Sequence, residues 1–366
     1  MTKQQNRLAS LKAKMKETGT DLVAIGPSSH MEWVLGFRTH ADERPCLLLI
    51  TQSSEAFLMP ALNAEGTRER CDIPFFPWSD DEGPAQAIKK ALEHLDGETI
   101  RTVVLDETMR ADFAYTLTRA LPNEINVEFT EKTVGHLRMI KDADDLELIQ
   151  ASALIDDQAI LTAFDFIKPG MTESQVAAQI REYFQSQGAT PAFWIVGSGP
   201  NGAFPHHSVS ERVIQTGDAI VIDIGARKNG FPSDITRMAV IGDPSEEYKK
   251  VHAIVEKAVQ AALLAAKPGV PAKAVDAAAR GVITDAGYGE YFVHRTGHGL
   301  GIDGHERPFI TATNDIILEE GMVFSIEPGI YLPGKFGVRL EEIVALTKEG
   351  PRVFSALPRD YHIIKI

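Results

Sequence analysis

The sequence predicts a mixed α/β (α+β) protein of two domains, and three observations support this prediction. Its 366 residues are more than one ordinary hydrophobic core accommodates. The first third alternates strand-like apolar runs with amphipathic helical patterns, which is typical of an α/β domain. The remainder contains an internal repeat of helices and strands. We therefore expect one domain at residues 1–134 and a second at residues 135–366.

The first domain is expected to alternate short strands with helices and to end near Thr130. Period-3.6 patterns predict helices at residues 7–16, 85–95 and 111–121. Short apolar runs predict the strands DLVAIG (21–26), EWVLGF (32–37), PCLLLI (45–50), EAFLMP (55–60) and TVVLDE (102–107). The polar residues of this domain form no recognisable site.

Composition and charge exclude several classes of function. The net charge of −14 and the pI near 5.3 argue against nucleic acid and anionic membranes as partners. The N-terminal segment lacks the apolar core of a signal peptide, and no apolar run is long enough to span a bilayer. Two cysteines form neither a disulfide framework nor a thiolate metal site. We expect a cytoplasmic protein.

The second domain contains two copies of one unit. Residues 152–171 match residues 251–270 at an offset of 99, and Thr172 with Gln175 forms a capping-box pattern where the next helix of the first copy begins. His206 aligns with His305 at the same offset. GDAIVIDIG (217–225) aligns with GMVFSIEPG (321–329), which places Asp223 on Glu327; Asp234 falls near Glu341. A pseudo-two-fold axis between the copies would bring these four carboxylates to one centre.

The strand pairs that carry the carboxylates predict a cation site. Asn229-Gly230 favours a two-residue type I′ turn, which places Asp223 opposite Thr236 and makes Asp223 and Asp234 diagonal neighbours on one face. Glu327 and Glu341 lie on a second strand pair, whose connection contains Pro333 and Gly334. Four facing carboxylates repel one another unless cations lie between them.

The glycine-rich segment HRTGHGLGIDGHE (294–306) supplies nitrogen ligands. It contains His294, His298 and His305. Oxygen-rich ligation with one imidazole suits Mn²⁺, Co²⁺, Fe²⁺ or Zn²⁺, and the sequence does not decide among them. Two such ions would bridge a hydroxide and polarise a carbonyl.

Five segments together resemble one enzyme family. DIG, SDITR, HRTGHGLGIDGHE, SIEPGIY and GVRLEE, in this order, resemble the Xaa-Pro peptidases, the prolidase and aminopeptidase P group of pita-bread metallopeptidases. The resemblance covers residues 137–366 and extends more loosely to the first domain, which is similar to the creatinase-type N-terminal domain. It implies a C-terminal pita-bread domain and hydrolysis of Xaa-Pro bonds by a hydroxide that bridges two divalent metal ions, with Mn²⁺ favoured.

The resemblance also implies the roles of individual residues. The implied metal ligands are Asp223, Asp234, His298, Glu327 and Glu341, with Asp234 and Glu341 bridging the two ions. His206 would contact the substrate and carry protons, His305 would stabilise the oxyanion, and Glu327 would accept a proton. His294 would shape the proline pocket, and Arg339 would orient the substrate and the neighbouring acids. The resemblance further implies a homodimer.

The substrate side of the site is less well defined by the sequence. Candidates for the apolar proline pocket are Phe193, Trp194, Phe204 and Tyr331. Related dipeptidases often anchor the substrate carboxylate with an arginine shortly after HE-x-P, but no arginine follows Pro308 in ERPFITATND. Arg295 and Arg307 remain as substitutes or as structural ion-pair residues. We favour an Xaa-Pro dipeptidase over an Xaa-Pro aminopeptidase acting on longer peptides.

Several alternatives share the fold. A related pita-bread metalloenzyme could act on a non-peptide amide or a small osmolyte, because the metal ligands do not define the substrate. A metal-free binding protein and a creatinase-like hydrolase are both disfavoured by the complete ligand set. Methionine aminopeptidases share the ligands but are less similar in HRTGHG and HE-x-P, and they lack such an N-terminal domain.

Overall fold

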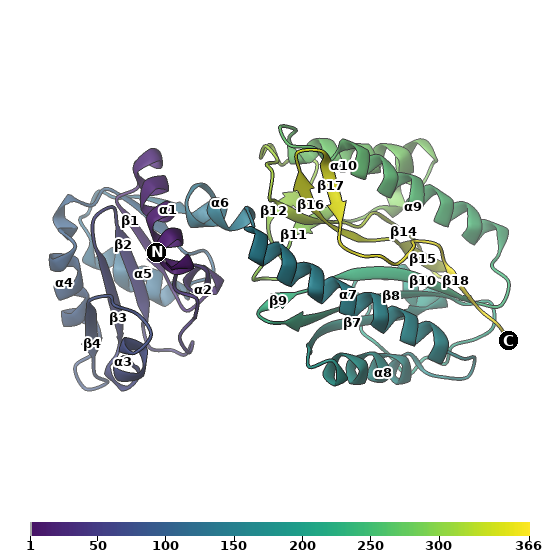
Figure 1. Cartoon of the computed structure of the whole chain (residues 1–366), viewed down its shortest axis with the longest axis horizontal. Helices are drawn as coiled ribbons and strands as arrows, with labels where there is room; N and C mark the ends of the chain where they lie inside the picture. Colours follow the sequence, from purple (N-terminus) through teal and green to yellow (C-terminus); the bar gives the residue numbers. More distant parts are fainter. Residues whose placement is uncertain (1) are drawn as a thin grey trace. The chain divides into compact units, whose positions relative to one another are not determined.

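The computed structural model describes residues 2–366, which divide into two compact units after Arg138 (Figure 1). Helix α6 (Val134–Met139) spans the division, and the boundary expected after residue 134 falls at the start of this helix. Within residues 2–366, no helix combines the length and the apolar character that crossing a membrane requires.

The N-terminal unit is built on one six-stranded sheet in the order β4-β3-β2-β1-β5-β6. The pairs β1–β2 and β2–β3 are antiparallel, and the other pairs are parallel. Its strands are β1 (Leu22–Ile25), β2 (Leu47–Thr51), β3 (Glu55–Pro60), β4 (Phe75–Trp78), β5 (Thr102–Leu105) and β6 (Asn126–Phe129). Its helices are α1 (Lys3–Thr18), α2 (Ser29–Leu35), α3 (Ala61–Arg68), α4 (Ala85–His94) and α5 (Ala111–Ala120).

One predicted strand of this unit was wrong. EWVLGF, expected to be a strand at residues 32–37, lies mainly in helix α2. The Ser28 side chain accepts a hydrogen bond from the backbone of His30, and Gly36 ends the helix in the left-handed conformation at φ 78°. The short run is rich in aromatic and branched residues, so its composition favoured a strand, but these two caps define one buried helical segment.

The C-terminal unit repeats one pattern of helices and strands. Its helices are α7 (Ala143–Phe166), α8 (Glu173–Ser186), α9 (Glu246–Ala265) and α10 (Ala272–Asp285). The ends of α7 and α9, and both bounds of α8 and α10, agree with the offset of 99. The capping box predicted at Thr172 and Gln175 is present. The strands of the first half are β7 (Thr190–Ser198), β8 (Ala219–Lys228), β9 (Phe231–Pro232) and β10 (Ile235–Ile241). Those of the second half are β11 (Gly297–Gly299), β12 (Glu306–Ile310), β13 (Val323–Ile326), β14 (Gly329–Leu332), β15 (Phe336–Arg339), β16 (Glu342–Thr347) and β17 (Gly350–Val353), and β18 (His362–Ile364) returns to pair with β10.

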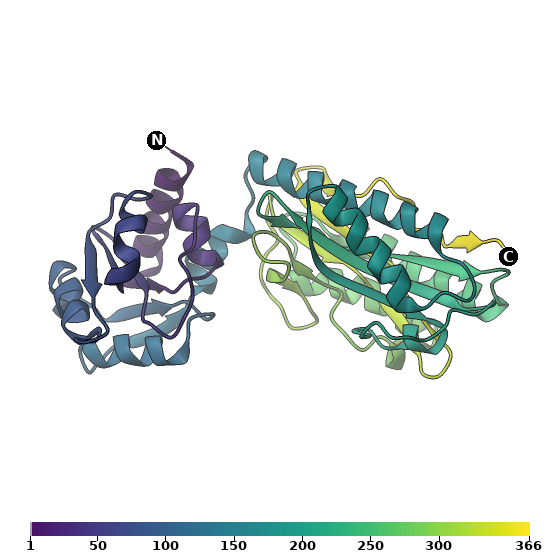
Figure 2. The same ribbon diagram turned by 90° about the horizontal axis from the view of Figure 1, so that it is seen from below.

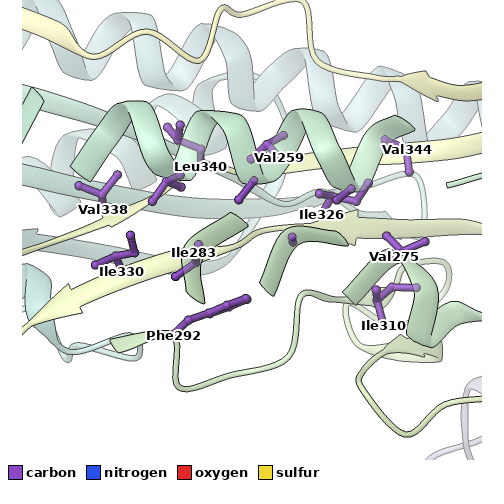
Figure 3. Close-up of a cluster of buried hydrophobic side chains, with 14 of the residues drawn as sticks. Val259, Val275, Ile283, Phe292, Ile310, Ile326, Ile330, Val338, Leu340 and Val344 are labelled. Atoms are coloured by element: carbon purple, nitrogen blue, oxygen red, sulfur yellow. The ribbon is translucent and has the colours of Figure 1, made fainter. Parts of the chain in front are cut away.

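Each half of the C-terminal unit has its own apolar core. Helices α7 and α8 lie side by side against the sheet β18-β10-β8-β7 (Figure 2). Helices α9 and α10 pack with the second-half strands, and Val259, Val275, Ile326 and Val344 are part of this cluster (Figure 3). Along β8, Ile220, Ile222 and Ile224 belong to the first core, whereas Ala219 and Val221 belong to the second. Asp223 therefore lies on the face of β8 that is turned away from α7 and α8.

The two carboxylate-bearing strand pairs have different registers. Asn229 and Gly230 both have positive φ, at 51° and 88°, as the predicted type I′ turn requires, and Asp223 pairs with Thr236 as predicted. In the second half, Ile326 pairs with Glu342 and Gly329 pairs with Arg339. Glu327 and Glu341 therefore face each other in the short interruption between β13–β16 and β14–β15, whereas Asp223 and Asp234 are diagonal neighbours.

Candidate metal centre

One cavity of about 660 Å³ in the C-terminal unit collects the residues that the sequence analysis singled out. Apolar side chains, Phe193, Ile195 and Pro205, form part of its wall. All residues predicted as metal ligands, as catalytic groups or to orient the substrate line this cavity: His206, Asp223, Asp234, His294, His298, His305, Glu327, Arg339 and Glu341.

The carboxylates and one imidazole form a tight cluster. Oxygen atoms of Asp223, Asp234 and Glu341 lie within 4.8 Å of one another, and so do ligand atoms of His298, Glu327 and Glu341. The Nε2 atom of His298 is 3.2 Å from Glu327 Oε1 and 3.6 Å from Asp234 Oδ2. Glu341 is 1% exposed, so water screens the repulsion between these carboxylates only weakly.

The electrostatics of this cluster favour a cation. Burial raises the pKa of Asp234 and of Glu341 well above its usual range, and neighbouring carboxylates raise both further. Burial also raises the pKa of Glu327 to about 7. Asp223 Oδ1 and Glu341 Oε1 are buried without a hydrogen-bond partner. Cations among these oxygens would satisfy both orphaned atoms and offset the repulsion, so the residues present fit a divalent metal site.

His298 is oriented as a nitrogen ligand. Its Nδ1 lies 3.1 Å from the carbonyl of Gly299 and donates to it, which leaves the Nε2 lone pair directed at the carboxylates. Burial lowers the pKa of this imidazole to about 3, so the ring is neutral at pH 7. A Cβ on Gly297 would lie 1.9 Å from Ser325 O, so only glycine lets β11 approach β13 this closely.

A buried hydrogen-bond chain surrounds the cluster. The Arg339 guanidinium donates to Asp223 Oδ2, to Thr236 Oγ1 at 3.1 Å and to Tyr331 Oη at 2.7 Å. Thr236 Oγ1 in turn donates to Glu341 Oε2 at 2.8 Å. The Nδ1 of His294 donates to the carbonyl of Arg295 at 2.7 Å, so its Nε2 accepts a hydrogen bond from the Tyr331 hydroxyl at 2.8 Å. Burial, followed by the Arg339 charge, lowers the pKa of His294 to about 4, which keeps this ring neutral.

A buried carboxylate holds the loop that carries His206. Glu173, at the start of α8, is fully buried and accepts hydrogen bonds from the backbone and hydroxyl groups of Ser198 and Ser210. His207 Nε2 also donates to it, at 2.8 Å. Burial alone would raise the pKa of Glu173, but these hydrogen bonds lower it below its usual value. Both histidines line the cavity, but His207 is paired with Glu173, while His206 is exposed.

Sequence reasoning missed several residues of this arrangement. Thr236 and Glu173 were not assigned a role, although the strand alternation placed Thr236 on the same face as Asp234. Among the proposed aromatic residues, Phe193 lines the cavity, Trp194 lies beneath the Arg181 guanidinium, and Phe204 is 61% exposed. Tyr331 is buried, and its hydroxyl joins His294 to Arg339.

The chain matches known proteins along nearly its whole length. Residues 147–348 match metallopeptidase family M24, and residues 7–140 match the Creatinase/Prolidase N-terminal domain. Over 365 residues the chain is 33% identical to the Xaa-Pro dipeptidase of Lactobacillus helveticus, covering 98% of this chain and 99% of the relative.

Solved structures agree with these matches. The dipeptidase PepE of Mycobacterium ulcerans is 35% identical and superposes with a TM-score of 0.93, covering 100% of this chain and 98% of that chain. The X-Pro aminopeptidase of Thermotoga maritima is 33% identical with a TM-score of 0.79, covering 96% of this chain and 100% of that chain. The predicted fold class, a creatinase-type N-terminal domain followed by a pita-bread domain, is thereby confirmed. With its cluster of carboxylate and imidazole ligands on this fold, the chain belongs to metallopeptidase family M24.

Proposed function

We propose that this metallopeptidase hydrolyses the bond before proline in Xaa-Pro dipeptides with two divalent cations, Mn²⁺ being favoured. The observation that carries the proposal is the cluster of four carboxylates and one neutral imidazole in a cavity whose wall also includes the apolar side chains of Phe193, Ile195 and Pro205. The cluster contains two overlapping groups, Asp223–Asp234–Glu341 and His298–Glu327–Glu341, which supports two cation positions rather than one. When bound, the cations would activate a water molecule as nucleophile and polarise the scissile carbonyl.

The protein's own residues complete the chemistry. Ser325 Oγ donates to Glu327 Oε1 at 2.8 Å and fixes this carboxylate at the cavity wall, where it accepts the proton of the attacking water. His305 lies over His298, with ring centroids 3.8 Å apart, and is placed to donate to the oxyanion of the tetrahedral intermediate. His206, exposed at the cavity wall, delivers a proton to the departing prolyl nitrogen.

The preference for proline follows from the character of the wall. The nitrogen of an Xaa-Pro bond carries no hydrogen, so the enzyme gains nothing from an acceptor at that position. Phe193, Ile195 and Pro205 instead offer apolar surface to a pyrrolidine ring. A secondary amide in the same place would leave its N–H without a partner, which disfavours other dipeptides.

The test is turnover of Ala-Pro, Ala-Pro-Ala and Ala-Ala by chelator-stripped protein, with and without added Mn²⁺. The proposal expects Mn²⁺-dependent cleavage of Ala-Pro and little cleavage of Ala-Ala. Preferred cleavage of Ala-Pro-Ala would make the enzyme an aminopeptidase. If Mn²⁺ binds but none of the three is cleaved, the related metalloenzyme acting on a non-peptide amide becomes the better hypothesis.

We also propose that the protein works in the cytoplasm as a homodimer. Cys46 and Cys71 are both free thiols, which suits a reducing compartment. Light scattering coupled to size-exclusion chromatography tests the dimer through its mass.

A further inference from the structure

One guanidinium in the cavity wall has no anionic partner. Arg295 lines the cavity and is half-buried, and no carboxylate of residues 2–366 lies within ion-pair distance of it. Its Nη2 atom donates to His305 Nδ1 at 3.3 Å, and its Cζ atom is 4.6 Å from the centroid of the Phe309 ring. Both contacts are with neutral groups. The charge of Glu327 acts on Arg295 only from beyond ion-pair distance. A partly desolvated cation that faces a cavity without an ion-pair partner favours an anionic group of the ligand.

The other arginines near the site do not serve this purpose. Arg339 also lines the cavity, but it is 3% exposed and already donates to Asp223, Thr236 and Tyr331. Arg307 approaches the same aromatic ring, with its Cζ atom 5.8 Å from the Phe309 centroid, yet it is not among the described residues that line the cavity. Arg295 is therefore the guanidinium of this wall whose charge remains available to a ligand.

The position of Arg295 matches the length of a dipeptide. Nitrogen and oxygen atoms of His305, His298 and Asp234 lie within 4.8 Å of one another, so His305 borders the metal cluster, and Arg295 contacts Nδ1 of the same ring. The carboxylate of a dipeptide lies one residue beyond the scissile carbonyl, and consecutive Cα atoms are about 3.8 Å apart. With the carbonyl at the cluster, the carboxylate reaches a cation located one imidazole ring away.

We propose that Arg295 binds the α-carboxylate of the substrate and thereby selects dipeptides over longer peptides. This inference rests on the proposed function. The flat Phe309 ring supports the planar guanidinium, whose paired N–H groups suit a carboxylate. The same contact orients His305: because Arg295 donates to Nδ1, the proton of the neutral ring lies on Nε2. A longer peptide presents a neutral amide at this point, so it leaves the half-buried guanidinium without its anion.

The experiment compares Ala-Pro with its C-terminal amide, Ala-Pro-NH₂, on Mn²⁺-loaded protein. Wild-type enzyme should prefer the free acid at least tenfold in kcat/KM, about 1.4 kcal/mol. Arg295→Met should lose this preference: kcat/KM should fall at least tenfold more for the acid than for the amide, and a smaller loss common to both substrates reflects the lost contact with His305. Arg295→Lys should recover part of the preference, because lysine keeps the positive charge but lacks the paired N–H donors of the guanidinium. Arg307→Met is the matched control and should behave as wild type.

Binding of free proline, measured by isothermal titration calorimetry, provides a readout that does not depend on turnover. Proline should bind Arg295→Met at least tenfold more weakly than wild type and Arg307→Met as tightly as wild type. The inference is overturned if wild-type enzyme treats acid and amide alike, or if Arg295→Met keeps the preference. Equal loss with both substrates would also overturn it, because the residue would then act on structure or chemistry. If wild-type enzyme cleaves neither substrate, the proposed function itself has failed.

Discussion

At the scale of single residues, the centre depends on buried carboxylates that are unfavourable without a cation. Asp223 and Asp234 are 8% and 7% exposed, and both face Glu341. Hydrogen bonds from Thr236 and Arg339 satisfy one oxygen each of Glu341 and Asp223, while the second oxygen of each has no partner. The protein thus fixes the direction of each carboxylate but leaves its remaining oxygen for a ligand.

Asp234→Asn tests this arrangement. The amide keeps the size of the side chain but offers one neutral oxygen instead of two charged ones, so we expect activity to fall by at least about 10³-fold, on the order of 4 kcal/mol. The fold at saturating Mn²⁺ should remain, as judged by circular dichroism. Turnover close to that of wild type in this variant would contradict the two-cation mechanism.

The gain in stability from Mn²⁺ should depend on pH. The pKa of Glu327 is raised to about 7, and those of Asp234 and Glu341 are raised as well, so these carboxyl groups keep protons in the metal-stripped native state. In the unfolded chain they lose these protons near their ordinary pKa values, 4.5 for the glutamates and 3.8 for the aspartate. The native state then binds more protons, so the free energy of unfolding of the stripped protein falls as pH rises from about 4.5 to 7. Mn²⁺ replaces these protons.

The measurement is the difference in Tm between Mn²⁺-loaded and stripped protein across this window. We expect the difference in Tm to grow from about pH 5 to pH 7, because only the stripped protein loses stability through these carboxyl groups as the pH rises. The contributions of other titrating groups are common to both forms and cancel in the difference. Asp234→Asn is the control and should show a smaller growth. A difference that stays constant with pH would argue against proton–metal exchange at this cluster.

At the scale of elements, a single acidic residue at the start of a helix holds the loop that carries His206. The segment between β7 and β8 contains the 3₁₀ turn Gly199–Ala203 and then His206. Glu173 accepts hydrogen bonds from Ser198, at the end of β7, and from Ser210, four residues after His206. Helix α8 therefore acts as an anchor for the loop, because a fully buried carboxylate with several donors does not easily give them up.

Glu173→Gln should separate loop position from metal binding. The amide keeps the shape of the side chain but places an N–H₂ group against the donors of Ser198 and Ser210. We therefore expect the free energy of unfolding to fall by about 1–3 kcal/mol. Because His206 is then poorly positioned, kcat should fall about tenfold or more. Mn²⁺ affinity should stay constant, since the ligands lie on other strands. Glu182→Gln, an exposed position of the same helix, is the matched control and should change neither quantity.

At the scale of the whole C-terminal unit, one buried arginine links the two repeats. Arg237, on β10 of the first half, is fully buried and donates to the carbonyl of Glu341 and to Glu342 Oε1 at 2.9 Å in the second half. It also donates to the carbonyls of Leu357 and Pro358. The strand that carries Thr236 and the strand that follows Glu341 are therefore held together from behind the cluster.

Replacing either partner of this buried pair should be costly, whereas replacing both should cost less than the sum. Arg237→Met leaves Glu342 with one fewer cation in a buried site, and we expect a loss of about 3–5 kcal/mol in the free energy of unfolding. A double-mutant cycle with Glu342→Gln should show a coupling of about 1–3 kcal/mol. Lys249→Met, which removes an exposed pair with Glu246, should change stability by less than about 1 kcal/mol. Additive effects of Arg237→Met and Glu342→Gln would contradict the link.

Local chemistry in the sequence predicted much of the fold. The Asn229-Gly230 turn was predictable because it requires positive φ at two adjacent residues, and it in turn determined which residue faces Asp223. The Thr172 capping box was also predictable from local sequence, because its two partners are only three residues apart. EWVLGF failed because its composition favoured a strand, while the N-cap Ser28 lay outside the run and the C-cap Gly36 lay within it.

The sequence by itself determined which carboxylates would meet, because the internal repeat and the strand alternation can be read along the chain, whereas the family resemblance singled out His298 as the nitrogen ligand. Only the tertiary structure decided what each polar group does there. It paired His207 with Glu173 and left His206 exposed, joined His294 to Arg339 through the Tyr331 hydroxyl, and kept Arg295 without an ion-pair partner. These contacts join residues far apart in the chain, and their geometry is set by how two helix-backed halves pack, which no local pattern encodes.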